Sequence, residues 1–242
     1  MNRSSGGRGL RNPLLFALLG LEVLVGISAI GVVVGSTDVM TVPGRGMENT
    51  AQVGDRVIVQ RGHDVRRGDV VTVTAPEWGG AGGVGGVGGG ADRVYMSRVI
   101  GVGGDQVASD ARGQLTVNGR ALHEDYVKPG PALSRPFNVK VPPGRIWVMG
   151  DNRPLQAHSP LHVGDPGGGT LQAGNVKGRV IEAGKGSSWR EVTSPSRSGM
   201  PVPVIALLVA AVAAVLFLIS LPVVLVVVLR GSKAPRDPAF RT

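Results

Sequence analysis

Two long apolar runs frame the pattern of hydrophobic and polar positions along this 242-residue chain. Residues 13–34 carry one charged side chain, Glu22, and residues 202–229 carry none. A helix of about 20 apolar residues is long enough to cross roughly 30 Å of hydrocarbon. The first run is too long for a cleaved secretion signal, and no clean small-x-small cleavage pattern follows it. We therefore expect two retained transmembrane helices, at residues 13–35 and 201–229.

The flanks of these two runs are short and basic. Arg3, Arg8 and Arg11 precede the first run, and residues 230–242 contain several further arginines and a lysine. Short basic flanks of transmembrane helices stay in the cytoplasm. The sequence therefore predicts a two-pass protein of the plasma membrane, with residues 1–12 and 230–242 in the cytoplasm and the intervening domain outside.

The intervening residues 36–199 have the pattern of a β-domain. Short runs rich in β-branched residues alternate with Gly, Pro, Asn and Asp, and no convincing amphipathic helix interrupts them. The runs are residues 56–60, 69–74, 94–100, 115–118, 145–149 and 176–181. Asn118-Gly119 is a strong signal for a hairpin. We expect a mainly β, antiparallel, barrel-like domain anchored by the two helices.

Glycine-rich segments and turn residues account for most of the remaining pattern. Residues 79–90 are nearly pure Gly and lack the strand, helix and lysine of a phosphate-binding loop, so we interpret them as a floppy surface loop. Residues 165–170 are expected to behave in the same way. Asp55, Asp69 and Asp105 each follow a Gly and are expected to form turns, because no His or Glu accompanies them at the spacing of metal ligands.

The net charge of +9 and the pI of about 10.9 raise nucleic acid as a partner. Much of the excess charge lies in the terminal flanks, however, and the middle of the chain has few aromatic residues. The lipid bilayer is therefore the expected partner, and nucleic acid is not. The chain has no Cys, which excludes disulfides and thiol chemistry. The four His residues show no metal pattern and are expected in solvated loops, so we expect no metal and no cofactor.

Four blocks of sequence follow one another in a fixed order: VPGRGMENT from residue 42 with VGDRVIV from residue 53, RGDVV from residue 67, YMSRVIGVGGD from residue 95 and VPPGRIWVMGDNR from residue 141. Together they resemble the bacterial type I signal peptidases, which are membrane-bound serine proteases that cut signal peptides from exported proteins. A fifth short stretch, at residues 122–127, resembles the family's segment between its third and fourth blocks. The resemblance covers about residues 43–181 and suggests a degenerate, actinobacterial-looking member.

The resemblance implies a Ser/Lys dyad that this chain lacks. In the family, a lysine desolvated by apolar neighbours accepts the proton of a nucleophilic serine. The nucleophile immediately precedes the methionine of the first block, where this chain has Gly46 before Met47. The base immediately precedes the arginine of the third block, where this chain has Ser97 before Arg98. Loss of both groups removes the covalent route to peptide cleavage.

Other parts of the implied site are only partly kept. Gly44 stands at the position of the family's oxyanion-hole serine, although backbone N–H groups could still point inward. Two residues after the fourth block the family has a serine, then one variable residue, and then Asp-Ser-Arg. Here the corresponding run is PLQAHSP, in which only Ser159 matches. The four residues before that run are retained as Gly150, Asp151, Asn152 and Arg153, and we favour a structural turn for them.

Several alternatives stay open at this point. The lysines Lys128, Lys140, Lys177, Lys185 and Lys233 all lie outside the third block, and a relocated Ser97 nucleophile has no identifiable base. Met47 either lines the substrate or membrane edge, which we favour if it is exposed near the anchor, or fills a gap in the core. Glu22 either contacts a partner helix or is protonated and tolerated in the membrane.

The resulting hypothesis is an inactive homologue of signal peptidase I that binds exported substrates, through their signal peptides, or modulates an active paralogue. One alternative is an active serine-type endopeptidase that uses non-standard residues. Another is a non-enzymatic structural membrane protein, with the β-domain as a spacer.

Overall fold

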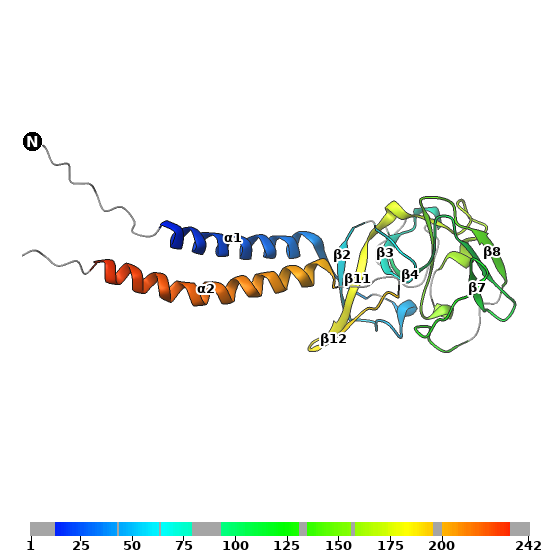
Figure 1. Ribbon diagram of the computed structural model, residues 1–242. Coiled ribbons are helices and arrows are strands. Elements are labelled where there is room, and N and C mark those ends of the chain that lie inside the picture. Colours follow the sequence, from blue (N-terminus) through cyan, green and yellow to red (C-terminus); the bar gives the residue numbers. More distant parts are fainter. Residues whose placement is uncertain are drawn as a thin grey trace, which may run out of the picture. The chain divides into compact units, whose positions relative to one another are not determined.

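The computed structural model describes residues 13–42, 44–62, 64–78, 93–130, 135–155, 158–195 and 200–232. The chain divides into two compact units, one built from the two long helices and one that covers Ser36–Gly199. Every β-strand of the described residues belongs to the second unit (Figure 1). The glycine-rich loop expected at residues 79–90 lies outside the described residues.

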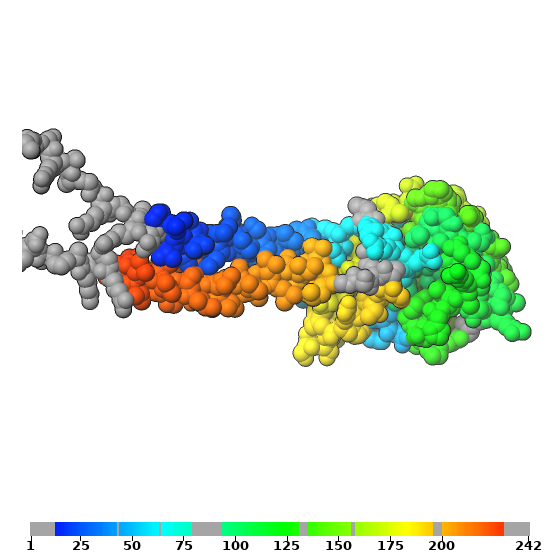
Figure 2. Space-filling model, viewed as in Figure 1, coloured from blue at the N-terminus to red at the C-terminus, as the bar shows by residue number. Residues whose placement is uncertain are grey.

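The helical unit consists of α1 (Pro13–Ser36) and α2 (Val202–Ser232), which run side by side in opposite directions (Figures 1 and 2). Both helices are long and apolar enough to cross a membrane, by length and composition. Ala29, Ala206 and Ala213 are among the few buried residues of these helices, and their small side chains leave space between the helices. Ser220 Oγ donates a hydrogen bond to Glu22 Oε2 at 2.8 Å, so the one carboxyl group of α1 is bonded to α2.

The second unit contains a large, curled antiparallel sheet. Its strands run in the order β1-β2-β11-β3-β4-β9-β10, and β12 pairs with β11. Their bounds are β1 (Thr37–Thr41), β2 (Arg56–Arg61), β3 (Val70–Thr74), β4 (Val94–Val102), β9 (Arg145–Met149), β10 (Leu171–Gln172), β11 (Val176–Lys185) and β12 (Ser188–Glu191). The register of β11 shifts between Val180 and Glu182, a bulge that bends this long strand.

A smaller antiparallel sheet has the order β7-β6-β5-β8. Its strands are β5 (Gln106–Ser109), β6 (Leu115–Val117), β7 (Arg120–Ala121) and β8 (Phe137–Lys140). Asn118 (φ 53°) and Gly119 (φ 75°) connect β6 to β7, which is the backbone of the tight hairpin that the sequence predicts. The fold class expected from the sequence, mainly antiparallel β with an apolar helix near each end, is confirmed.

The central strands β3, β4 and β9 of the large sheet are buried on both faces, which explains why they are rich in apolar residues. Along β3, Val71 and Val73 pack in one cluster with Trp78 and Tyr95, whereas Val70 packs in a second cluster with Met96. A third cluster joins the two sheets and contains Ile100, Val107, Leu115, Val117, Val141, Trp147 and Met149. Short 3-10 turns complete the domain: η1 (Arg45–Met47), η2 (Pro76–Trp78), η4 (Arg153–Leu155), η5 (Ser159–His162) and η6 (Ala173–Asn175).

The three aspartates that follow glycines have the turn role expected of them. Each carboxylate accepts a hydrogen bond at 2.9 Å from the backbone N–H three residues earlier, at Gln52, Arg66 and Val102. Because each Asp lies directly before a strand or at its start, these bonds fix where β2, β3 and β5 begin.

The expectation of a floppy loop at residues 165–170 is wrong. Thr170 is buried, and its hydroxyl accepts a hydrogen bond from Arg145 Nε at 2.6 Å. Gly169 has a φ of +80°, and a Cβ at this position would lie 2.3 Å from the carbonyl oxygen of Ser159. Gly169 is therefore needed for the close approach of two packed segments and not for flexibility. Composition alone does not distinguish these two roles of glycine.

Candidate functional site

The site is built around a turn, residues 45–50, that packs against β4. Met47 in this turn and Met96 on β4 belong to the same buried cluster. Gly46 and Ser97 each adjoin one of these methionines, so the fold brings together the two segments that carry the implied dyad positions. Met47 is only 2% exposed, so the expectation that it lines a substrate or membrane edge is wrong, and it fills the core instead.

A buried ion pair connects β4 to the segment after β9. Arg98 donates from Nε to Asp151 Oδ1 at 2.9 Å and from Nη2 to Asp151 Oδ2 at 2.7 Å. Thr50 also donates its hydroxyl proton to Asp151 Oδ2, and it accepts a hydrogen bond from Arg98 at 3.2 Å. Because Thr50 ends the turn that holds Gly46, this network anchors the turn to both β4 and Asp151.

Asn152 clamps the same turn through its backbone and its side chain. Its N–H donates to the carbonyl oxygen of Gly46 at 2.9 Å, and its Nδ2 donates to the carbonyl oxygen of Arg45 at 2.9 Å. Arg153 closes the adjoining turn by donating to the carbonyl oxygen of Gly150 at 2.8 Å, and it pairs with Glu124. These bonds make Gly150, Asp151, Asn152 and Arg153 a structural brace for the turn at Gly46.

Glu48 is a largely buried residue of this turn that contacts three polar side chains. Its carboxylate contacts Arg45 Nε at 2.5 Å, Lys128 Nζ at 2.6 Å and Asn152 Nδ2 at 3.1 Å. The hydrogen bonds from Arg45 and then Lys128 lower the pKa of Glu48 to about 2, so this group stays ionised at any physiological pH. Lys128 Nζ is thereby paired with a carboxylate, whereas a lysine that acts as a general base is desolvated among apolar neighbours.

The segment around Tyr126 covers the ion pair. The Tyr126 ring lies over the Arg98 guanidinium, 3.9 Å from its carbon to the ring centroid. Burial, reinforced by Glu124, raises the pKa of the Tyr126 phenol, so it stays neutral. Asn49 Nδ2 donates to the carbonyl oxygen of Tyr126 at 3.0 Å, and the Lys128 N–H donates to the carbonyl oxygen of Asp151 at 2.8 Å. The turn, β4 and this segment thus form one connected polar network.

Ser97 lies in the middle of β4, opposite Val71 in the ladder with β3, and has no exposed surface. Residues two apart on a strand share a face, so Ser97 lies on the side of Tyr95 and Val99, two members of the first core cluster. A peptide in solution has no access to a hydroxyl in that position. The structure therefore gives no support to Ser97 as a relocated nucleophile.

Ser159 and His158 stand where the family has its Asp-Ser-Arg run. Ser159 Oγ accepts a hydrogen bond from the Val148 N–H at 2.9 Å, so it supports the end of the sheet. His158 is 2% exposed, and neither ring nitrogen has a hydrogen-bond partner among the described residues. Burial, together with the nearby Arg153 and His162, lowers the pKa of His158 to about 4, which keeps the ring neutral.

The expectation that the histidines occupy solvated loops is wrong for His158 and also for His162. The latter stacks on Trp78 with ring centroids 4.3 Å apart. The expectation fits His123, whose side chain is largely exposed, and His63 lies outside the described residues. No signal in the sequence separates the two classes, because histidine is intermediate in its tendency to be buried.

Gly44 has an extended backbone (φ −147°, ψ 171°) and precedes η1. It offers no hydroxyl at the position that the resemblance assigns to the oxyanion hole. Among the described ranges, no group of three or more His, Asp or Glu side chains could hold a metal ion.

Sequence reasoning missed Glu48, Thr50, Tyr126 and Lys128 as parts of the site. Glu48 and Thr50 lie inside the first block, and Tyr126 lies inside the short stretch at residues 122–127. Their places in those blocks were a usable signal, but their partners lie 77 to 101 residues away along the chain. Pairing over such separations is visible only in the fold.

Several known proteins are similar to this chain in sequence. The family model described as signal peptidase, peptidase S26, matches residues 15–182. Signal peptidase I of Mycobacterium tuberculosis is 43% identical over 100 residues, which are 35% of this chain and 34% of that protein. Probable signal peptidase I-2 of Synechocystis is 32% identical over 131 residues, 52% of this chain and 56% of that protein.

A crystal structure of a signal peptidase I from Enterococcus faecalis overlaps 48% of this chain and 96% of its own, with a TM-score of 0.34 and 23% identity. The matched segments thus span about a third to just over half of the length of the curated relatives named above. The family model, in contrast, extends from within α1 to within β11 and takes in every residue of the polar network around Gly46. This chain belongs to the signal peptidase family, peptidase S26.

Proposed function

We propose that this chain is a catalytically inactive signal peptidase homologue that binds the signal peptides of exported proteins without cleaving them. The observation that carries the proposal is the state of the two dyad positions. Gly46 has no side chain to form an acyl-enzyme, and Ser97 has neither a useful pKa as a base nor any exposed surface.

No other group among the described residues is placed to replace the dyad. Lys128 is paired with Glu48, and Lys140, Lys177 and Lys185 are exposed on β8 and β11. His158 is neutral and could accept a proton, but no described hydroxyl reaches either of its ring nitrogens. The alternative of an active endopeptidase with non-standard residues therefore lacks a nucleophile with its base.

The preserved scaffold favours binding over a mere spacer. The Arg98–Asp151 pair and the Asn152 bonds hold the turn at Gly46 in a defined position, at the cost of burying several polar groups. Buried polar networks are expensive unless every member is satisfied. This network is present even though the dyad residues are missing. Its presence is explained if the surface around the turn still binds a peptide, for instance one that adds a strand to the sheet.

The location follows from the helices and their flanks. We propose a two-pass protein of the plasma membrane with both termini in the cytoplasm, because the basic residues lie at the two chain ends. The β-domain would then lie on the side where signal peptides emerge. From there the protein could present substrates to an active paralogue or compete with it for them.

The test is a paired binding and cleavage assay on the purified full chain in lipid nanodiscs. A fluorescent signal peptide should bind, and a preprotein should remain uncut over hours in the same sample. Processing that disappears in Ser97→Ala, but persists in the control Ser109→Ala on β5, would show that the chain is an active enzyme. Absence of any peptide binding would favour the structural spacer.

A gain-of-function variant tests whether the cleft is intact. Gly46→Ser combined with Ser97→Lys restores both dyad groups, and burial at residue 97 should lower the pKa of the new amine toward the neutral form. We expect weak but measurable cleavage from the double variant and none from either single variant. No cleavage from the double variant would mean either that a side chain at residue 97, on the side of the first core cluster, does not reach residue 46, or that the changes at residues 158–160 have also disabled the site.

A further inference from the structure

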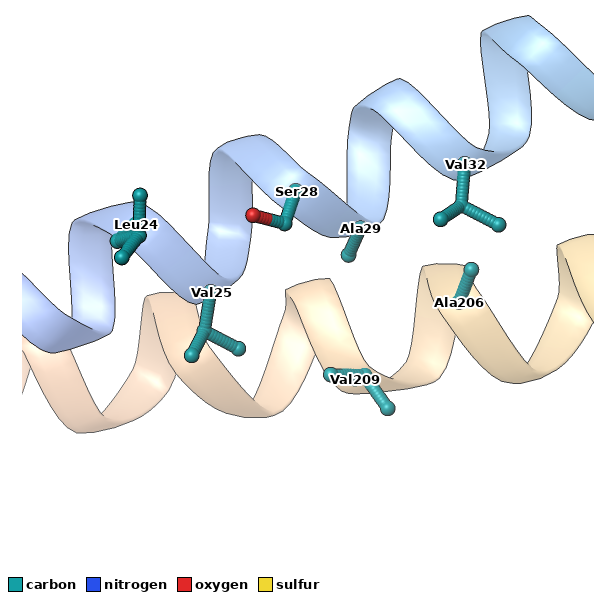
Figure 3. Close-up of a pocket in the computed structure, with 7 residues that line it drawn as sticks. All are labelled: Leu24, Val25, Ser28, Ala29, Val32, Ala206 and Val209. Atoms are coloured by element: carbon teal, nitrogen blue, oxygen red, sulfur yellow. The ribbon is translucent and has the colours of Figure 1, made fainter.

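The α1–α2 pair has a continuous apolar groove along one side. Its first part, about 360 Å³, is lined by residues that include Ser28, Ala29 and Ala206 (Figure 3). Its second part, about 420 Å³, is lined by Glu22, Ala213 and apolar neighbours. The two parts share Val25 and Val209, so they form one groove.

Glu22 places one polar, acidic side chain in this largely apolar groove. It is the one charged residue within α1, and residues 202–229 of α2 contain none. Its Oε2 accepts a hydrogen bond from Ser220, and a polar carboxyl group of this kind is costly in hydrocarbon. A cationic group that enters the groove would form an ion pair with this carboxyl group, and lipid tails would not. The complement of the groove is therefore an apolar helix that carries a positive charge at one end.

Length selects the kind of helix. Glu22 lies fourteen residues before Ser36, the last residue of α1, which is about 21 Å along a helix axis. A secretory signal has a positively charged segment followed by an apolar stretch of about 7–15 residues, or roughly 10–22 Å as a helix. An apolar stretch of about 12–14 residues that ends level with Ser36 thus places its preceding Lys or Arg close to the depth of Glu22.

We propose that the groove between α1 and α2 binds the apolar helix of a signal peptide and that Glu22 pairs with the basic segment preceding it. This inference rests on the proposed function, since it names how the same substrate class is recognised. Ala29, Ala206 and Ala213 contribute by keeping the groove open to a third helix. Ser220 orients the Glu22 carboxyl group but supplies no charge.

The experiment compares two peptides on the full chain in nanodiscs of phosphatidylcholine, a zwitterionic lipid. One peptide has Lys and Arg before a 12-residue apolar stretch, and the other has Gln at those positions. We expect the basic peptide to bind about 10-fold more tightly to the wild type, which corresponds to about 1.4 kcal/mol. Glu22→Gln should bring the ratio of dissociation constants close to one. The control Leu18→Ala, at an exposed residue of α1 that lines neither part of the groove, should keep the ratio.

Two further measurements address the geometry. Lengthening the apolar stretch by eight residues moves the cation by about 12 Å along the helix axis and should abolish the ratio. Ala213→Leu narrows the groove and should weaken both peptides to a similar extent. Since the chain has no Cys, Val25→Cys adds a single thiol that can report cross-linking to a Cys placed in the peptide.

The outcomes are distinguishable. If both peptides bind and Glu22→Gln leaves their ratio unchanged, the groove proposal is wrong while the proposed function stands. If neither peptide binds the wild type, the proposed function fails, and the groove proposal fails with it. If Val25→Cys instead cross-links two copies of the chain and the peptide does not compete, the groove is a dimer contact and the proposal is overturned.

Discussion

Arg98 and Asp151 form an ion pair with two hydrogen bonds, in which the side chains are only 3% and 1% exposed. Such a pair gives little net stability compared with an apolar contact, but removing one partner leaves the other charged and buried. Losing one partner of this ion pair should therefore lower the stability of the fold far more than the intact pair raises it.

We predict that Asp151→Asn destabilises the β-domain by about 3–5 kcal/mol, because Arg98 loses its counter-charge in a buried site. Denaturant unfolding followed by Trp fluorescence would measure the loss. The matched control is Asp38→Asn, which breaks the pair with Arg61 on the surface, where both side chains are about half exposed. Equal losses in the two variants would contradict a special role for the buried pair.

The pH dependence of stability should report on His158. Its pKa in the folded chain is lowered to about 4 from the usual 6.5, so the unfolded chain binds the extra proton first as pH falls. Stability should be highest above pH 6.5 and decline by roughly 3 kcal/mol as pH falls toward 4. His158→Leu should flatten this decline.

The control for that prediction is His123→Leu, which removes a largely exposed ring. It should leave the slope between pH 6.5 and 4 as it is in the wild type. Carboxylates with lowered pKa values, such as Glu48, lose their contribution to the stability of the fold only as pH falls from about 4.5 toward 2. An unchanged slope in His158→Leu would show that another group is responsible.

Gly169 should not tolerate a side chain. Gly169→Ala places a Cβ only 2.3 Å from the carbonyl oxygen of Ser159, at a backbone φ of +80°. The combined steric and backbone strain should cost about 3 kcal/mol or more, measured as a fall in the unfolding midpoint. Gly164→Ala is the matched control, since nothing lies within 4 Å of a Cβ there and its φ is not positive.

Glu48 should help to keep the segment around Tyr126 closed over the Arg98–Asp151 pair. Glu48→Gln removes the charge that holds Lys128 and Arg45, so the segment around Tyr126 should open more often. Hydrogen exchange at the Lys128 amide, which donates to Asp151, would be the measurement, and we expect faster exchange there. Exchange at the Val107 and Val117 amides in the smaller sheet should stay as in the wild type.

Local patterns predicted much of the fold. The Asn118-Gly119 hairpin, the strands that became β2, β3, β4, β6, β9 and β11 and the two apolar helices all carry signals within a few residues. The missed strands β1, β5, β7, β8, β10 and β12 are no longer than five residues, and long-range pairing rather than propensity decides them.

The sequence predicts where the dyad positions lie along the chain, but it does not predict the burial or the partners of the residues around them. The resemblance locates Gly46 and Ser97 by their neighbours Met47 and Arg98. Burial of Met47 and His158, and the role of Lys128 as a partner of Glu48, depend on packing between segments distant in sequence. Residue type gave the wrong expectation for the first two because Met and His occur in both environments.

The place of β11 between β2 and β3 has a consequence for how the chain folds. The large sheet cannot close until residues 176–185 have been made, more than a hundred residues after the strands that they join. Contacts of such high sequence separation slow folding, because the loop entropy is lost before the pairing compensates for it. Until then β2 and β3 expose unpaired edges that invite aggregation. The nascent chain should therefore need protection by a chaperone late into its synthesis, and a truncation before β11 should be insoluble.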